Sequence, residues 1–509
     1  MSGARSLRLL LGAALLSGCA AGPNYQVPED KAPSKFVAAS ATAPAVTVDT
    51  AATVDLARWW HSFHDPELDS LIERAVHANP DIEIALTRLQ EARTREAGLI
   101  GTALPQVAAS ADAGRGTGSD MTRAGAAPAL RAADNKGSLD AIRQVAGFAA
   151  SWEVDLFGGN RRAIEAGRYD VEAAAANRSA VLLSIIGEVA QSYVDLRGLQ
   201  ARRAILQKNI AAAEQLRDLE QSRYDRGLTN ELDLQLAERE LARLRSGLPA
   251  LEAELVASQY RIAVLLGQYP EQLADELSQP GTMPDLPATI DAGLPVDLIE
   301  RRPDVREAER NLAAATARIG VATAALFPHV DLSGGLGTQS ATIGPGEGSH
   351  IWAFGPSVYW PLLDFGVLDA QVDVADLQTH ERLIAYRKTV IGAVREADTA
   401  IASFGAQQQR LASLADAMRA SERAVSLAEQ RYDRGLTDFL NVVDAEHQQF
   451  STEDDYTVAQ QNAADAFIFV YKALGGGWER YQDIPPIRRP EPAVIAEFQR
   501  ALTRNGPQR

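Results

Sequence analysis

The sequence predicts an α+β membrane protein in which one structural unit occurs twice along a chain of 509 residues. The heptapeptide Arg-Tyr-Asp-Arg-Gly-Leu-Thr occurs at Arg223 to Thr229 and again at Arg431 to Thr437, which indicates an internal repeat. Each copy also has about 65 residues without proline and two short segments that alternate between apolar and polar positions. We therefore expect a pair of strands and a very long helix in both copies.

Two offsets relate the copies. From Trp152 onward, equivalent residues lie 208 positions apart (431 − 223), so that Trp152 corresponds to Trp360. Upstream of the strands the offset is 223 positions (303 − 80), because Pro80 opens the same motif as Pro303. The first copy must therefore contain extra residues between these two regions.

The extra residues of copy one lie between Pro105 and Trp152. The segment 114–138 is rich in Gly, Ala, Ser and Asp, so we expect a long exposed loop there. The segment 334–348 of copy two is its shorter counterpart.

The N-terminus has the features of a secretory signal. Arg5 and Arg8 precede an apolar run that is too short to span a bilayer as a helix. Cys19 is the only cysteine, and it directly follows Leu-Ser-Gly, which resembles a bacterial lipoprotein processing box. This likeness implies cleavage before Cys19 and acylation of its thiol and new amino group. Ala20, in place of Asp, favours sorting to the outer membrane; the alternative is an ordinary signal peptide with a chance cysteine.

The charge of the chain excludes some classes of ligand. The net charge of −17 argues against nucleic acid or anionic lipid as the main ligand. After Cys19 there is no run of 18 or more apolar residues, so a membrane span would have to be built from strands.

Each copy begins with a stretch of helical periodicity, Pro80 to Ala103 or Pro303 to Leu326, that opens at a proline. Alternating segments follow, clearly at 330–336 and 352–360 and more weakly at 148–154. Strands that face lipid on one side and a lumen on the other have this pattern. A soluble, half-buried hairpin is the alternative.

The proline-free stretches begin after Gly158 and Gly366 and predict helices of roughly 100 Å, too long for a compact globule. Gly227 and Gly435 suit left-handed C-caps, and Thr229 and Thr437 suit N-caps of the next helices. Shorter helices would return over 230–266 and 438–474. A plain two-stranded coiled coil is the alternative for such alanine-rich helices, but the sequence keeps no strict heptad.

Two strands in each copy give four strands per chain, and four strands cannot close a barrel. Because open sheet edges are not tolerated in lipid, subunits must pool their strands. A trimer would supply twelve strands, and the long helices would form a second, α-helical barrel continuous with the first. These residues alone do not determine the number of subunits.

Several blocks resemble the outer-membrane factor (TolC-like) family, and within it the lipoprotein branch (NodT/OprM-like) that serves RND-type multidrug efflux. The most specific blocks are Gly22-Pro23-Asn24-Tyr25-Gln26-Val27-Pro28, Trp59-Trp60-His61-Ser62-Phe63, Arg301-Arg302-Pro303-Asp304-Val305-Arg306 and Tyr471-Lys472-Ala473-Leu474-Gly475-Gly476-Gly477-Trp478. The resemblance runs from Cys19 to about Trp478, nearly the whole mature chain.

This resemblance implies a homotrimer with a twelve-stranded barrel in the outer membrane, a periplasmic helical tunnel and a mixed equatorial domain. With the repeat, it divides the chain into a signal peptide (1–18), a lipid-anchored tail with an equatorial segment (19–79), repeat 1 (80–267), an equatorial linker (268–302), repeat 2 (303–475) and a C-terminal equatorial tail (476–509). The only prosthetic group implied is the lipid on Cys19; no cofactor or metal is expected.

The resemblance also places a gate at the periplasmic tip. Leu440 and Asp444 lie four residues apart, on one helical face, and align with the family's constriction. Three copies of Asp444 around a narrow axis would repel one another and favour cations. The family often has Arg where this chain has His447, which makes pH-sensitive opening conceivable. Copy one has Leu236 in place of Asp444; ordinary solvated side chains are the alternative.

The two repeated turns would lie at the exposed tip, where the resemblance implies that a periplasmic membrane-fusion adaptor docks. Their residues are Arg223, Tyr224, Asp225, Arg226, Gly227, Leu228 and Thr229 in copy one and Arg431, Tyr432, Asp433, Arg434, Gly435, Leu436 and Thr437 in copy two. Helix-capping turns without a partner are the alternative.

The sequence lacks the motifs of common enzymes, including G-x-G-x-x-G, Walker A, G-x-S-x-G and H-E-x-x-H, and its seven histidines are scattered. The resemblance implies a passive exit duct that works with an inner-membrane RND pump and exports drugs and other small toxic compounds. A duct for type I protein secretion or metal efflux is a second possibility within the fold. A non-channel coiled-coil lipoprotein is the competing class.

Overall fold

The computed structural model describes residues 20–28, 36–37, 46–47, 56–116, 141–287, 290–291, 301–340 and 349–481. The chain divides into two compact units, each described by itself. Unit 1 comprises residues 1–31, 91–176 and 304–391, and unit 2 comprises residues 32–90, 177–303 and 392–509. Cys19 lies outside the described residues.

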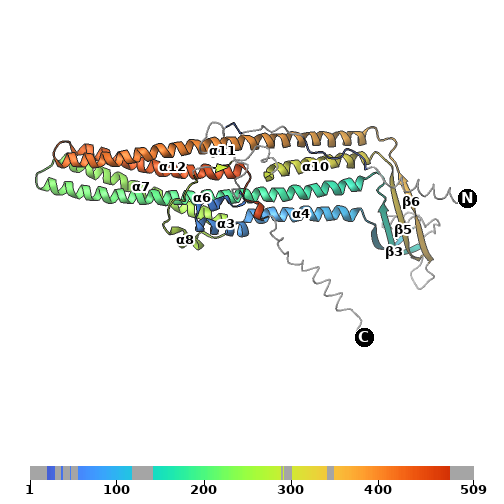
Figure 1. The fold of residues 1–509 in the computed structure, drawn as a ribbon. Helices are drawn as coiled ribbons and strands as arrows, with labels where there is room; N and C mark the ends of the chain where they lie inside the picture. The colour runs from blue at the N-terminus through green and yellow to red at the C-terminus, as the bar shows by residue number, and fades with distance from the viewer. Residues whose placement is uncertain are drawn as a thin grey trace. The chain divides into compact units, whose positions relative to one another are not determined.

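Unit 1 contains one antiparallel sheet of four strands in the order β2-β3-β5-β6 (Figure 1). The strands are β2 (Gln106–Gly116), β3 (Ala141–Glu153), β5 (His329–Ser340) and β6 (Ser349–Tyr359). The prediction of four strands per chain is confirmed. Because β2 and β6 have no partner on their outer edges among the described residues, the sheet offers two free edges for pairing with other subunits.

The loop predictions were partly wrong. Residues 114–116 belong to β2 and residues 334–340 to β5, and the remaining loop residues lie outside the described part of the chain. Small residues misled the prediction, because glycine here permits close contact between strands. A Cβ atom at Gly147 would lie 2.5 Å from the carbonyl oxygen of Leu336, since Gly147 is paired with Gly337 across β3 and β5.

One face of this sheet carries large apolar side chains. Phe148 lies opposite Leu336, and Leu336 lies opposite Trp352, so that an exposed apolar row crosses β3, β5 and β6. The alternation predicted from the sequence therefore corresponds to two chemically different faces.

The predicted long helices are confirmed, and their lengths match between the copies. Helices α6 and α11 have 67 residues each, and α7 and α12 have 35 each. The helices are α4 (Pro80–Thr102), α6 (Gly159–Asp225) and α7 (Glu231–Leu265) in copy one, and α10 (Pro303–Ala324), α11 (Val367–Asp433) and α12 (Phe439–Ala473) in copy two (Figure 1).

Equivalent hydrogen bonds join the strands to the first helices in both copies. The indole N–H of Trp152 donates to the carbonyl oxygen of Ala103 at 3.0 Å, and that of Trp360 donates to Leu326 at 3.1 Å. The tryptophans are related by the offset of 208 and the acceptors by the offset of 223. Both copies therefore fold alike on either side of the insertion.

The repeated turns end the long helices as expected. Gly227 has φ +69° and Gly435 has φ +67°, the left-handed conformation that favours glycine. The expected N-caps were wrong by one residue, because Asn230 and Asp438 occupy the N-cap positions instead of Thr229 and Thr437. The Asn230 side chain accepts from the backbone N–H of Asp233 at 3.0 Å. Both neighbouring side chains are able to cap, so spacing alone did not distinguish them.

Segments far apart in the sequence form the rest of unit 2. They are β1 (Val46–Thr47), η1 (Leu56–Phe63), α3 (Pro66–Ala78), η2 (Pro270–Gln272), α8 (Ala274–Ser278), β4 (Ile290–Asp291) and η3 (Glu479–Tyr481). Strands β1 and β4 pair in parallel. Arg74 forms an ion pair with Glu276 at 2.8 Å, and the Tyr481 hydroxyl donates to Glu73 at 2.9 Å. The N-terminal segment thus contacts both the linker and the C-terminal segment.

Candidate functional site

The predicted gate residues lie at the start of α12. Phe439, Val442 and Val443 are buried in a cluster with Ala237 of α7. Leu440, 54% exposed, and Asp444 point away from this cluster. Helical periodicity thus divides this turn of α12 into a packed side and a free side, and both residues predicted for the constriction are on the free side.

His447 does not contact Asp444. It is half-buried, and its Nδ1 accepts a hydrogen bond of 2.9 Å from the guanidinium of Arg243 on α7. Arg243 also pairs with Glu240 at 2.6 Å. The imidazole of His447 on α12 is thus bonded to an arginine of the other copy, on α7.

A buried carboxylate near the turns was missed by the sequence analysis. The Glu220 side chain on α6 is completely buried, and it accepts a hydrogen bond of 3.0 Å from the hydroxyl of Tyr432 on α11. Burial and the neighbouring carboxylate raise the pKa of Tyr432 to about 12. The guanidinium of Arg223 lies 4.8 Å from the centre of the Tyr432 ring and 3.5 Å from Glu220. These three groups link the two copies.

This contact joins Glu220 of copy one to Tyr432 of copy two, and the reverse contact does not form. The position equivalent to Glu220 in copy two is Ala428, and Tyr224, the equivalent of Tyr432, is exposed. The repeat alone does not single out this position, because most residues differ between the two long helices.

The other residues of the two turns are largely accessible. Leu228 and Leu436 are 69% and 63% exposed, and the charged side chains of Asp225, Arg226 and Arg434 are also exposed. Each turn therefore has an exposed leucine with charged side chains around it. Arg223 and Tyr432 instead contact each other between the two copies.

Glu446 is a second acidic group in this region. Burial raises its pKa to about 7, and the carboxylates of Glu429 and Glu240 contribute to the shift. A raised pKa means that the folded state binds the proton more tightly than the unfolded state.

We expect Glu446→Gln to stabilise the helical tip at pH 8 and to have little effect at pH 4. The proton on Glu446 stabilises the fold below pH 4.5, and this contribution is lost as the pH rises through about 7. The variant should gain about 1–2 kcal/mol at pH 8, which allows for partial solvent screening. Thermal unfolding at the two pH values measures the difference, with Glu238→Gln, an exposed position on α7, as control. An equal gain at both pH values would contradict the expectation.

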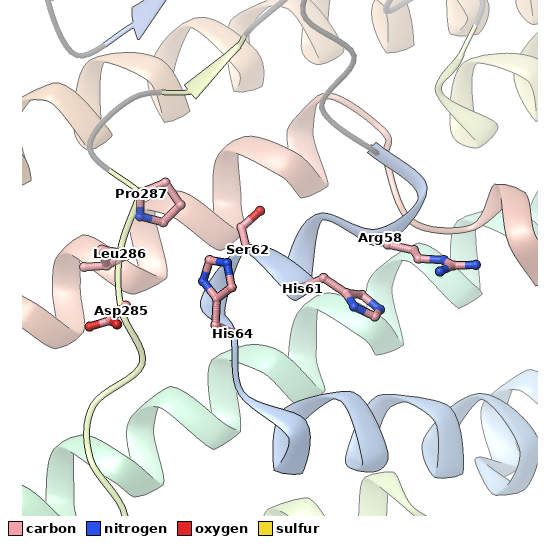
Figure 2. A pocket seen from close by; sticks show the side chains of 7 residues that line it. All are labelled: Arg58, His61, Ser62, His64, Asp285, Leu286 and Pro287. Carbon is pink, nitrogen blue, oxygen red and sulfur yellow. The ribbon is translucent and has the colours of Figure 1, made fainter.

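A separate cavity of about 630 Å³ lies in unit 2, where η1 meets the linker (Figure 2). It is lined by Arg58, His61, Ser62, His64, Asp285, Leu286 and Pro287. His61 pairs with Asp69 at 3.6 Å. Within the described ranges, no group of three or more His, Cys, Asp or Glu side chains is placed to hold a metal ion.

The segment that follows Cys19 is held firmly within unit 1. The backbone N–H of Ala21 donates to Phe157 at 2.9 Å, and the buried Arg162 binds the carbonyl oxygens of Ala21 and Gly22 at 3.0 and 3.3 Å. Gly22 has φ +79° and lies against Gly320, where a Cβ atom would be 2.5 Å from the Gly320 Cα. Residues 21 and 22 are therefore anchored beside the turn that joins β3 to α6.

Of the helices in the described part of the chain, α6 alone is long and apolar enough to cross a membrane by length and composition. More than half of its most apolar window is buried within the protein. The core helix of a soluble protein has the same properties, so this finding carries little weight.

The chain matches the model of the family described as outer membrane efflux protein over residues 71–268 and 294–476. It is 29% identical to nodulation protein T of Rhizobium leguminosarum bv. trifolii over 466 residues, which covers 91% of this chain and 96% of that protein. It is 31% identical to the pyoverdine export outer membrane protein OpmQ of Pseudomonas putida over 429 residues, with 83% and 88% covered.

Among solved structures, the outer-membrane channel OprN is similar with a TM-score of 0.80 and 36% identity, over 90% of this chain and all of that one. These likenesses confirm the predicted fold class, a trimeric channel to which each subunit brings four strands and long helices. The family model matches both repeats, and the four-stranded sheet with two free edges agrees with this match. The chain therefore belongs to the outer membrane efflux protein family.

Proposed function

We propose that this outer-membrane efflux channel is the exit duct of a tripartite RND-type system that exports drugs and other small toxic compounds. The observation that carries the proposal is the four-stranded sheet with free edges at β2 and β6, which closes into a barrel only when subunits pool their strands. A channel of this kind transports passively. Energy would come from an inner-membrane RND pump, and a periplasmic membrane-fusion adaptor would connect the two.

The free side of α12 would form the gate. If Leu440 and Asp444 face the axis of the trimer, three carboxylates and three leucines narrow the tunnel at one level. The repulsion between the carboxylates favours a cation at this level and limits how tightly the tip closes. His447 is bonded to Arg243 of α7, so it would act on the gate through the contact between α7 and α12.

The repeated turns would be the docking site of the adaptor. Leu228 and Leu436 supply apolar contacts, and the surrounding arginines and aspartates supply charge, a combination typical of transient interfaces. The lipid on Cys19 would hold the protein in the inner leaflet of the outer membrane before and after assembly.

We expect Asp444→Ala to enlarge the single-channel currents of the purified protein in planar bilayers. Replacing three carboxylates with methyl groups removes the larger side chains that narrow the tunnel, and we expect this widening to outweigh the loss of repulsion between the charges. Wild type should show small, rarely opening currents. Glu238→Ala, which removes an exposed carboxylate from α7, should behave like wild type.

Two results would contradict this proposal in different ways. Equal currents from wild type and Asp444→Ala would remove Asp444 from the gate. If deleting the gene changed neither drug susceptibility nor dye retention in a host without related ducts, the export of drugs would be wrong.

A further inference from the structure

The segment 58–64 has an apolar side and a polar side. The apolar side is buried in the core of unit 2 and consists of Trp59, Trp60 and Phe63. The polar side lines the cavity of about 630 Å³ where η1 meets the linker, and it consists of Arg58, His61, Ser62 and His64 (Figure 2). The buried rings explain how η1 is held in place. They do not explain why its other side has an arginine, a serine and two histidines around a cavity.

The backbone of His64 has an unfavourable conformation. Its φ of +51° lies in the left-handed region, which raises the free energy of any residue with a Cβ atom, although histidine tolerates it better than most. Both neighbours are fixed by other contacts, because Phe63 is in the core and Asp65 caps α3 by accepting from the backbone N–H of Glu67 at 3.0 Å. The N–H of His64 donates to the carbonyl oxygen of His61 at 3.0 Å and closes the turn. Glycine would form this turn more easily, so the turn alone does not account for a histidine.

The side chains of Ser62 and His64 are available to a molecule in the cavity. Figure 2 shows the imidazole of His64 beside Ser62, on the side of η1 that faces the linker. Within the described part of the chain, neither the imidazole nor the hydroxyl has a hydrogen-bond partner. An imidazole and a hydroxyl are both able to donate hydrogen bonds. Two donors therefore face the cavity from one wall.

The wall formed by η1 is also the cationic wall of the cavity. Arg58 is positively charged, and the imidazoles of His61 and His64 each gain a positive charge on protonation. His61 lies 3.6 Å from Asp69, which balances the charge of its protonated ring. The carboxylate of Asp285 on the opposite wall points away from His64 in Figure 2. In a chain of net charge −17, this wall is a local site of attraction for anions.

The opposite wall adds apolar surface. It is formed by the linker segment between α8 and β4, where Leu286 and Pro287 are half-buried and line the cavity. Small-molecule sites combine apolar walls with a few polar groups and have volumes of roughly 300–1,000 Å³. The cavity meets both conditions, and its polar groups select for negative charge.

We propose that this cavity binds a small organic anion, a carboxylate or phosphate attached to an apolar body. The anionic head accepts hydrogen bonds from the imidazole of His64 and the hydroxyl of Ser62, and Arg58 attracts it from further along η1. The body lies against Leu286 and Pro287. The bound molecule joins η1 to the linker, two segments about 221 residues apart in sequence (285 − 64). This site is independent of the gate and of the compounds that the channel exports.

Chemical modification of individual histidines measures occupancy of the site. Diethyl pyrocarbonate acylates accessible imidazoles, and mass spectrometry assigns the reaction to each histidine of the full-length protein in detergent. Benzoate and phenyl phosphate are the anionic probes, and benzamide is the neutral control of the same size as benzoate. The concentration dependence of protection gives the Kd. At about nine times the Kd, either anion should slow modification of His64 about tenfold. His77, which is 58% exposed on α3, should react at an unchanged rate.

Variants that keep His64 as the reporter test its neighbours. Ser62→Leu removes a donor and places a larger side chain in the cavity, so protection of His64 should be lost. Arg58→Gln removes a charge at some distance from the head and should weaken binding by roughly two- to fivefold. Arg239→Gln, an exposed position on α7 outside the cavity, should bind like wild type.

Calorimetric titration with benzoate tests His64 itself. His64→Asn keeps a residue that tolerates the left-handed conformation, so the turn is preserved while the imidazole is removed. Loss of this contact to a charged group should weaken binding at least about tenfold, whereas His77→Asn should have no effect. Equal protection of His64 and His77, equal protection by benzamide, or no protection by either anion up to its solubility limit would overturn the proposal. Unchanged affinity in folded His64→Asn protein would do the same.

Discussion

Replacing Trp59 with alanine should destabilise unit 2 by roughly 3–5 kcal/mol, the usual loss for a large aromatic side chain removed from a core. Trp59 is 1% exposed and stacks on Tyr471 of α12 with ring centres 5.7 Å apart. Phe467 and Phe63 contact its edges at 6.4 Å each. One side chain thus holds η1 against the end of α12.

Urea unfolding of the detergent-solubilised protein measures this loss. Tyr269→Ala provides the control, because Tyr269 is 77% exposed and its removal should change the free energy of unfolding by less than about 0.5 kcal/mol. Trp59→Phe, which keeps most of the aromatic contact, should fall between the two variants. A loss below about 1 kcal/mol for Trp59→Ala would mean that the cluster collapses around the vacancy.

The helices and strands were predictable because each pattern occurred twice. A single proline-free stretch permits several interpretations, but two stretches that end at the same heptapeptide indicate one long helix that turns back. The position of Leu440 and Asp444 on one side of α12 followed from their spacing alone. Both the long helices and the shared side of Leu440 and Asp444 depend only on residues close together in the sequence.

Contacts between the copies were not predictable in the same way. The Tyr432 hydroxyl reaches Glu220 across 212 residues of sequence, and Arg243 reaches His447 across 204. Pattern analysis reports the periodicity within an element but not which elements become neighbours.

The extent of the strands was misjudged for a related reason. Glycine and small polar residues ordinarily indicate a loop, and residues 114–116 and 334–340 have this composition. In β3 and β5 the pairing of Gly147 with Gly337 shows what such residues do here: they let two strands approach closely on the face opposite the apolar row. The composition showed that small side chains occur in these segments, but it did not show that they serve the close pairing of two strands.

Replacing Arg162 with methionine should release the segment 20–28 from unit 1. Arg162 is 4% exposed, and besides the two carbonyl oxygens it binds Asn24 at 2.7 Å and Glu165 at 2.8 Å. Methionine preserves most of the apolar stem but none of the donors. Hydrogen bonds to a charged group contribute about 1.5–3 kcal/mol each, so the loss of several should exceed about 2 kcal/mol in total.

Hydrogen exchange of residues 20–28 measures the release, and Arg161→Met is the matched control. Arg161 is the adjacent residue, but its side chain is half exposed and pairs with Asp155 at 3.3 Å at the surface, so its loss should leave the segment protected. Equal protection in both variants would assign the stability of this segment to the Gly22–Gly320 contact instead. Because residue 19 precedes the segment directly, its release would also lengthen the tether between the proposed lipid and the folded protein, from a residue or two to about nine. A lipid on Cys19 of the Arg162→Met protein should therefore still hold it at the membrane, but no longer fix its position beside the sheet.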